Sequence, residues 1–281
     1  MATAEPAHRL PRAGLRGVER AAVPIVDAIN TVPWVKATTW PIWRYGSKTF
    51  VMALSSRLYR LYGLEHIRAI DAPQGVILVP NHRSFFDLFF VASALVDTAP
   101  HVAGRMMFPV RKDYFYDRSL GLLLNLGLTA GSMWPPVFRD ERRGDFNAIA
   151  MAQLGRVMRK GTIAGIHPEG QRGRGDDPYV LGKIRPGLGQ VVAAAHPDAL
   201  ILPTWILGMS NDFFGTARRN YRPAGQRGEP VRIWFGAPLR AGDLVARYPD
   251  DPLALTQAVM AEVAALGERD RLERMRDPSP A

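Results

Sequence analysis

Short apolar runs and helical periodicities alternate over most of the chain. Runs typical of buried strands lie at residues 75–79, 105–108, 162–166, 199–206 and 231–235. Apolar residues at helical spacing lie at residues 88–95, 119–128, 146–160 and 252–267. Strands that alternate with helices predict an α/β fold, in which helices cover a sheet.

The first quarter of the chain has a different pattern. Residues 1–23 are rich in Ala, Arg and Pro and lack the apolar core of a signal peptide, so we expect a mobile tail. Residues 24–66 combine aromatic and basic side chains, with helical spacing from Thr49 to Leu64. This composition suits an amphipathic helical segment at a membrane interface, although an ordinary helical hairpin covering the sheet fits equally well. We predict no transmembrane span, because no run of about 18 uncharged apolar residues occurs.

Composition narrows the range of partners. The chain has 36 Lys and Arg against 26 Asp and Glu, a formal net charge of +10, which suggests an anionic partner. That partner could be nucleic acid, an acidic membrane surface or a phosphorylated substrate; no recognisable nucleic-acid motif occurs, so we expect no nucleic acid. The absence of cysteine excludes disulfides, thiol catalysis and a cysteine-based zinc site. We place the main domain at 67–267 and a charged C-terminal tail at 268–281.

A histidine and a carboxylate follow the first predicted strand. Pro80 ends the strand, His82 comes two residues later, and Asp87 begins the next apolar run. Open α/β sheets place their sites at such strand ends. A neutral imidazole can take a proton from a hydroxyl when a carboxylate holds its Nδ1. On a regular helix this spacing would put the side chains about 140° apart, so we expect His82 to precede the first full turn. A core histidine beside a helix-starting Asp fits the same residues.

Two later stretches place arginine near the ends of predicted strands. Residues 131–139 are Gly-Ser-Met-Trp-Pro-Pro-Val-Phe-Arg, and residues 167–173 are His-Pro-Glu-Gly-Gln-Arg-Gly. A guanidinium can hold phosphate oxygens through two parallel hydrogen bonds. Taken alone, a surface arginine and a strand-end turn would explain these stretches.

Together, the three stretches resemble the motifs of the glycerophospholipid acyltransferases, the family that includes the lysophosphatidic acid acyltransferases. The matching positions are His82 and Asp87 of the His-x4-Asp motif, Pro136, Val137 and Arg139 of the second motif, and Pro168, Glu169, Gly170 and Arg172 of the third. The departures are Met133 in the second motif, and His167, Gln171 and Gly173 in the third. The resemblance covers residues 75–240 and implies a mostly parallel mixed sheet flanked by helices, with an N-terminal helical segment that faces a membrane.

The resemblance also implies roles for individual residues. His82 would be the general base and Asp87 its partner, while Arg139 and Arg172 would bind the acceptor's phosphate, with Arg142 as a substitute for Arg139. The other candidate substrate contacts are Asn81, Ser84, Glu169 and Gly170. We interpret His167 as a packing residue, because the family position is normally apolar or aromatic.

The implied activity is acyl transfer from acyl-CoA or acyl-acyl carrier protein to the free hydroxyl of a lysophospholipid. The simplest acceptor is 1-acylglycerol 3-phosphate, which would give phosphatidic acid at the cytoplasmic face of an anionic membrane. No metal and no cofactor beyond this co-substrate is expected. Another lyso-lipid or glycerol 3-phosphate could be the acceptor instead. An alternative of another class is a catalytically inactive membrane-binding protein with the same fold.

Overall fold

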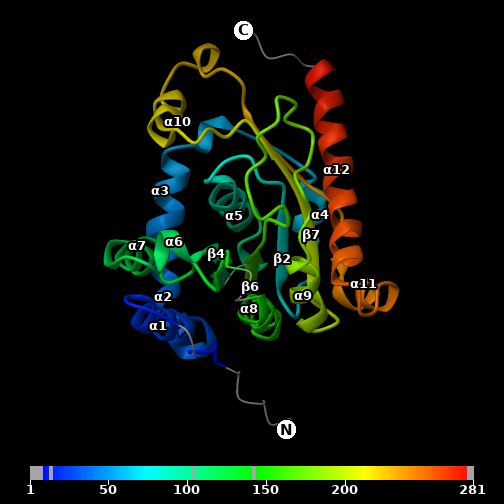
Figure 1. Cartoon of the computed structure of the whole chain (residues 1–281). Helices are drawn as coiled ribbons and strands as arrows, with labels where there is room; N and C mark the ends of the chain where they lie inside the picture. The colour runs from blue at the N-terminus through cyan, green and yellow to red at the C-terminus, as the bar shows by residue number, and fades with distance from the viewer. Residues whose placement is uncertain (1–8, 13–14, 103–104, 141–143, 277–281) are drawn as a thin grey trace.

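The computed structural model describes residues 9–12, 15–102, 105–140 and 144–276 (Figure 1). Its main sheet has the strand order β1-β8-β7-β2-β6-β3, with β9 paired to β7. The strands are β1 (Tyr59–Tyr62), β2 (Val76–Pro80), β3 (Arg105–Met107), β6 (Thr162–Gly165), β7 (Leu200–Leu207), β8 (Val231–Phe235) and β9 (Leu239–Arg240). A second, two-stranded sheet pairs β4 (Val110–Arg111) with β5 (Pro136–Val137).

The sheet is mostly parallel, as the sequence predicts. Strands β7, β2, β6 and β3 run in one direction, β8 is antiparallel to β7, and β1 is parallel to β8. The carboxyl ends of β2, β6 and β7 therefore lie at the same end of the sheet. Strands β8 and β1 begin at that end, where Arg232 pairs with Leu207 and Arg60 pairs with Arg232. We call this the carboxyl end of the sheet. Every residue of β2 is buried, as its unbroken apolar run predicts for a central strand.

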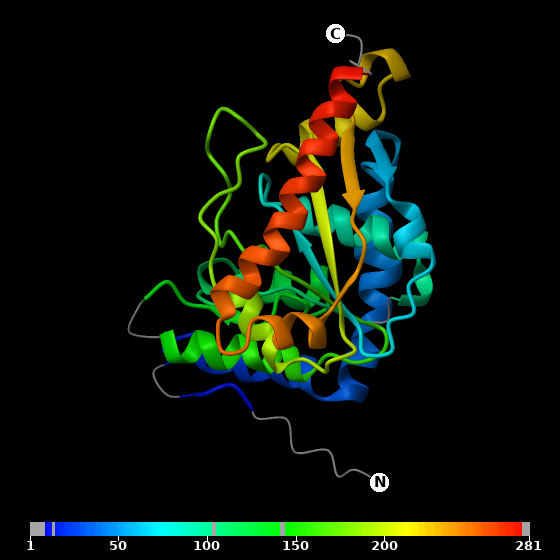
Figure 2. The ribbon, with the colours of Figure 1, turned by 90° about the vertical axis from the view of Figure 1, so that its right-hand side faces the viewer.

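Helices cover both sides of the sheet. In Figure 1, α3 and α5 lie on one side, and α9 and α12 lie on the other, with α8 packed against α9. Figure 2 shows α12 extending along the sheet. The α-helices are α1 (Glu19–Thr31), α2 (Pro33–Pro41), α3 (Lys48–Ala53), α4 (Leu64–Arg68), α5 (Asp87–Thr98), α6 (Lys112–Phe115), α7 (Ser119–Thr129), α8 (Gly144–Arg156), α9 (Gly187–Ala194), α10 (Phe213–Asn220), α11 (Ala241–Arg247) and α12 (Pro252–Arg276). A π-helix is formed by η1 (Ile42–Ser47), and short 3-10 helices are η2 (Ser56–Leu58), η3 (Pro100–Val102) and η5 (Ala224–Gln226).

The N-terminal region differs from its prediction. Part of the expected tail is packed, because Leu10 and Leu15 are buried and α1 begins at Glu19. The helix expected from Thr49 to Leu64 was wrong, since α3 ends at Ala53 and residues 59–62 form strand β1. The spacing of apolar residues there fits a short strand as well as a helix, and pairing with the distant strand β8 decides between them.

The expected boundary of the C-terminal tail was also wrong. Asp251 caps α12 by accepting a hydrogen bond from the Ala254 N–H, and the helix continues past Gly267 to Arg276. A Cβ on Gly267 would lie only 2.9 Å from the ring of Trp205, so this glycine permits close helix–sheet packing instead of ending the helix.

Candidate active site

His82 and Asp87 lie close together at the carboxyl end of the sheet. His82 lies on the turn after β2, and Asp87 is the first residue of α5. The Asp87 Oδ2 atom accepts hydrogen bonds of 2.6 Å from the backbone N–H groups of both Arg83 and Ser84. These bonds fold the turn back, so that His82 Nδ1 lies 3.5 Å from Asp87 Oδ2 in spite of the five-residue separation. The expectation that His82 precedes the helix is confirmed.

Burial disfavours the charged form of both side chains. Desolvation lowers the pKa of His82 to about 4, with a smaller contribution from the positive charge of Arg172. Desolvation also raises the pKa of the fully buried Asp87 to about 6, against the backbone hydrogen bonds that favour its ionised form. Among the described residues, His82 Nδ1 and Asp87 Oδ1 have no hydrogen-bond partner. A neutral imidazole beside a carboxylate that is ionised at pH 7 is the arrangement a general base requires.

His167 lies directly against this pair. Its ring stacks on the ring of His82, with centroids 3.9 Å apart and planes inclined by 13°. Its Nδ1 lies 3.1 Å from the carbonyl oxygen of Pro80, so this nitrogen carries the proton and donates it. Desolvation and the neighbouring His82 lower the pKa of His167 to about 3. The residue predicted only to pack thus contacts the predicted base itself.

Glu169 ties the two motif turns together. Its side chain is buried, and its Oε1 accepts a 2.7 Å hydrogen bond from the His82 N–H. Its Oε2 accepts a second hydrogen bond from the Gly182 N–H. Both oxygens are therefore engaged by the backbone, and burial raises the pKa of this carboxyl. Gly170, beside it, has a φ of +64°, a conformation that favours glycine.

Asn81 and Ser84 are buried and make hydrogen bonds within the protein. The Asn81 side chain accepts from the Ile206 N–H and donates to the Ile206 carbonyl, which fastens the turn to β7. The Ser84 hydroxyl donates to the Ser210 carbonyl at 3.0 Å. These contacts hold the loop after β7 against the histidine turn.

Arg172 reaches the same loop from the third motif. Its side chain is exposed, and Nη1 donates a 2.9 Å hydrogen bond to Asn211 Oδ1. The same Asn211 oxygen accepts from the Phe85 N–H, so Asn211 links the first and third motifs. Sequence reasoning missed Asn211, and no motif in the chain marks it, because its role depends on the packing of three loops.

Arg139 lies beside the small sheet, not at the end of the main one. It is exposed and follows β5, in the two-stranded sheet, whereas His82 and Arg172 follow β2 and β6 of the main sheet. Arg142, the substitute considered for it, lies outside the described residues. The structure thus joins His82, Asp87 and Glu169 through direct contacts and links Arg172 to the same turn through Asn211. Arg139 is left as a separate candidate.

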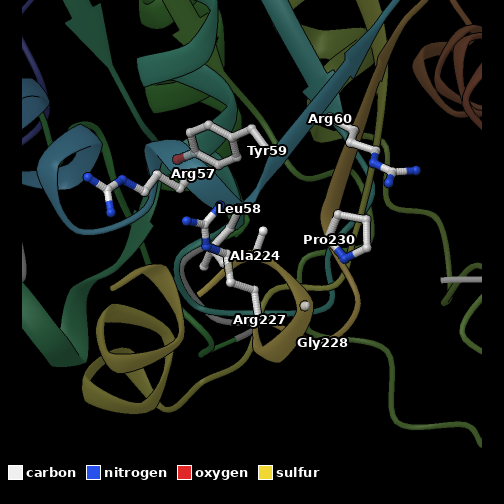
Figure 3. Close-up of a pocket in the computed structure, with 9 residues that line it drawn as sticks. Arg57, Leu58, Tyr59, Arg60, Ala224, Arg227, Gly228 and Pro230 are labelled. Carbon is white, nitrogen blue, oxygen red and sulfur yellow. The ribbon is translucent and has the colours of Figure 1, made fainter. Parts of the chain in front are cut away.

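A pocket of about 380 Å³ lies elsewhere along the carboxyl end of the sheet (Figure 3). It forms where β1 and β8 begin, and no acidic residue lines it. Figure 3 shows Arg57 and Arg60 extending to opposite sides, with Arg227 between them. The loop that forms one wall is held by its own arginines, because Arg219 donates to the Arg227 carbonyl and Arg227 donates to the Arg222 carbonyl.

The site therefore contains a partly buried histidine with a buried carboxylate beside it and an exposed arginine nearby. Among the described residues, no cluster of three or more His, Asp or Glu side chains could hold a metal ion. A hydroxyl placed against the exposed side of the His82 ring could lose its proton to Nε2, because Nδ1 faces Asp87.

Comparison with known proteins places the chain in a family. No curated protein matches the chain. Among solved structures, the 1-acyl-sn-glycerophosphate (LPA) acyltransferase PlsC from Thermotoga maritima is similar, with 16% identity, a TM-score of 0.47, and coverage of 92% of this chain and 84% of that chain. The family model for acyltransferases matches residues 59–207, which is more than half of the chain and includes His82, Asp87, Glu169 and Arg172. The chain belongs to the acyltransferase family.

Proposed function

We propose that this acyltransferase moves a fatty acyl group from a thioester donor to the hydroxyl of a lysophospholipid, with His82 as the general base. The contact between His82 Nδ1 and Asp87 Oδ2 carries the proposal. It orients Nε2 toward the substrate and places a carboxylate where positive charge develops on the ring. The preferred donor is acyl-CoA or acyl-acyl carrier protein, and the preferred acceptor is 1-acylglycerol 3-phosphate.

The reaction requires one proton to be moved twice. His82 Nε2 takes the proton of the acceptor hydroxyl as its oxygen attacks the thioester carbonyl, and Asp87 stabilises the imidazolium that forms. The tetrahedral intermediate then collapses, the carbon–sulfur bond breaks, and His82 returns the proton to the thiolate. The products are the new ester and the free thiol. General-base catalysis of this kind contributes about 10²–10⁴-fold.

The arginines of the second and third motifs support the proposal that the acceptor carries a phosphate. Arg172 is exposed beside His82, close enough for its charge to lower the pKa of that histidine. Its guanidinium can bind phosphate oxygens while Asn211 holds it from the other side. Arg139 is proposed as a second phosphate ligand, because a phosphate with a charge near −2 is held better by two cations.

Exposed apolar side chains support a membrane-facing helical layer. On α7 and the adjoining N-terminal elements, large apolar residues face solvent: Trp34, Ile42, Tyr45, Phe50, Leu120, Leu123, Leu124 and Leu128. We call them the apolar face. The two groups come from elements that touch, since α7 packs against η1. Basic residues accompany them, including Arg44 and Arg118, which suits an anionic lipid surface. Within the described chain, no helix is long and apolar enough to cross a membrane.

Release of free thiol from acyl-CoA tests the reaction. We expect release by the purified protein to depend on 1-acylglycerol 3-phosphate and to disappear in His82→Ala. The same assay with acyl-acyl carrier protein, glycerol 3-phosphate and other lyso-lipids separates the donors and acceptors. A protein that binds vesicles but releases no thiol with any of these pairs would instead be the inactive membrane-binding alternative.

Vesicle flotation tests the apolar face. Leu123→Asp puts a charge at a leucine that is 66% exposed, so folding should be unaffected while binding to phosphatidylglycerol vesicles falls. Leu272→Asp on α12, where the leucine is 54% exposed, is the matched control and should bind as the unmodified protein does. Equal losses in both variants would contradict the assignment of this face.

A further inference from the structure

His167 does more at this site than fill space. The structure places the ring of His167 face to face with the ring of His82. A centroid separation of 3.9 Å is shorter than the ~4.5–7 Å common for aromatic pairs. The His82 ring therefore has little room to tilt toward His167.

The contacts around His82 constrain it from four directions. Its backbone N–H donates to Glu169, and its carbonyl accepts from the Gly173 N–H at 2.9 Å. The edge of its ring faces Asp87, and one face of the ring is covered by His167. The backbone contacts fix where the side chain starts but leave rotation about its own bonds free, whereas Asp87 and His167 contact the ring itself.

His167 is itself held in place at the same strand end. Its Nδ1 donates to the carbonyl oxygen of Pro80, two residues before His82, and its side chain is partly buried on the third-motif turn. The residue thus holds the backbone that leads into the turn and covers one face of the His82 ring. At 3.5 Å, the contact between His82 and Asp87 is too long to fix the ring plane unaided.

We propose that His167 is a positioning residue, whose ring face holds the His82 imidazole in the plane in which Nδ1 faces Asp87 and Nε2 faces the acceptor hydroxyl. The proposal rests on the proposed function, in which His82 is the base. It attributes the effect to the flat ring of His167, not to its ability to carry a proton. The charged or titratable groups around His82 in this arrangement are Asp87, His167, Glu169 and Arg172.

Three substitutions separate the ring from the hydrogen bond. His167→Phe keeps a flat ring and loses the bond to Pro80, His167→Gln keeps a donor and loses the ring, and His167→Ala loses both. Because a misplacement of about 1 Å can cost 10²-fold in rate, we expect kcat to fall roughly 30–100-fold in the Ala and Gln variants, with KM nearly unchanged. The Phe variant should retain kcat within about fivefold.

A titration of His82 by NMR gives a second measurement that needs no turnover. Without the covering ring, water reaches His82, so its pKa should rise toward the ordinary 6.5 in His167→Ala and stay low in His167→Phe. Full activity in His167→Ala, or a Phe variant as slow as the Ala variant, would overturn the proposal. Recovery by Gln but not by Phe would also overturn it, in favour of the hydrogen bond to Pro80. If the unmodified protein releases no thiol, the proposed function fails, while the titration still shows whether His167 shields and orients His82.

Discussion

The histidine turn and the arginine-lined pocket lie at the same end of one sheet, but their charged side chains differ in exposure to solvent. At the turn, Asp87 and Glu169 are buried, and backbone N–H groups bind their oxygens. In the pocket, the side chains of Arg57 and Arg60 are exposed to solvent. Proton transfer needs a base that is neutral and fixed, whereas binding a phosphate needs positive charge that solvent and ligand can reach. In the proposed function, the turn would supply the base and the pocket would supply positive charge for a phosphate, both at the carboxyl end of the sheet.

The largest expected effect comes from removing the buried charge of the turn. Asp87→Asn can keep both backbone hydrogen bonds, because one oxygen, Oδ2, accepts them both. We expect thiol release to fall by about 10³-fold or more, since the amide cannot stabilise the imidazolium. Asp243→Asn, in the first turn of α11, is the matched control and should retain full activity.

The same variant should be more stable than the unmodified protein at neutral pH. The folded-state pKa of Asp87 is raised to about 6 from 3.8, so the folded protein binds more protons than the unfolded chain between those values. Stability from this group is therefore present below pH 4 and lost as pH rises through 6. Thermal melts should show Asp87→Asn gaining stability at pH 8 and little at pH 4. A loss of stability at pH 8 would mean that the ionised carboxylate is favoured by its partners.

An intermediate effect is expected where the two motif turns are joined. Glu169→Gln replaces one of two acceptor oxygens with a donor, so either the His82 N–H or the Gly182 N–H loses its partner. We expect a loss of roughly 10–100-fold in kcat and a lower melting temperature, because a buried donor is left unsatisfied. Glu268→Gln, 63% exposed, should change neither. Unchanged kcat in Glu169→Gln would show that the turn keeps its shape without this carboxylate.

The smallest effect tests the pocket. If it binds phosphates of a donor, Arg57→Gln should raise KM for acyl-CoA by about 3–10-fold and leave kcat unchanged. An acyl thioester of N-acetylcysteamine carries no phosphate, so its KM should not change. Arg247→Gln, an exposed arginine on α11, is the control. An equal rise in KM for both donors would remove the pocket from donor binding.

The sequence predicted the strands and motifs of this site better than their connections. The apolar runs that became β2, β6 and β7 were predicted because central strands are buried on both faces. The pairing of His82 with Asp87 was also predicted, because both residues belong to one local turn.

Features that depend on distant parts of the chain were not predicted. Strand β1 exists because it pairs with β8, about 170 residues away, and its own pattern also fits a helix. The stacking of His167 on His82 was not predicted, because it joins the ends of two strands that are neighbours only in the sheet. The exposure of the α7 leucines depends equally on what the fold leaves uncovered.

The contacts of α12 bear on the order in which the molecule can be completed during synthesis. Asp270 accepts hydrogen bonds of 2.9 Å from Tyr179 and from Trp234, and Arg271 forms an ion pair with Asp177. The segment from residue 177 to residue 182 in turn reaches Arg83 and Glu169. A ribosome makes residues 81–87 well before Asp270 and Arg271, the residues that brace the loop beside them. The turn that carries His82 therefore gains all of these supports only after α12 has been made.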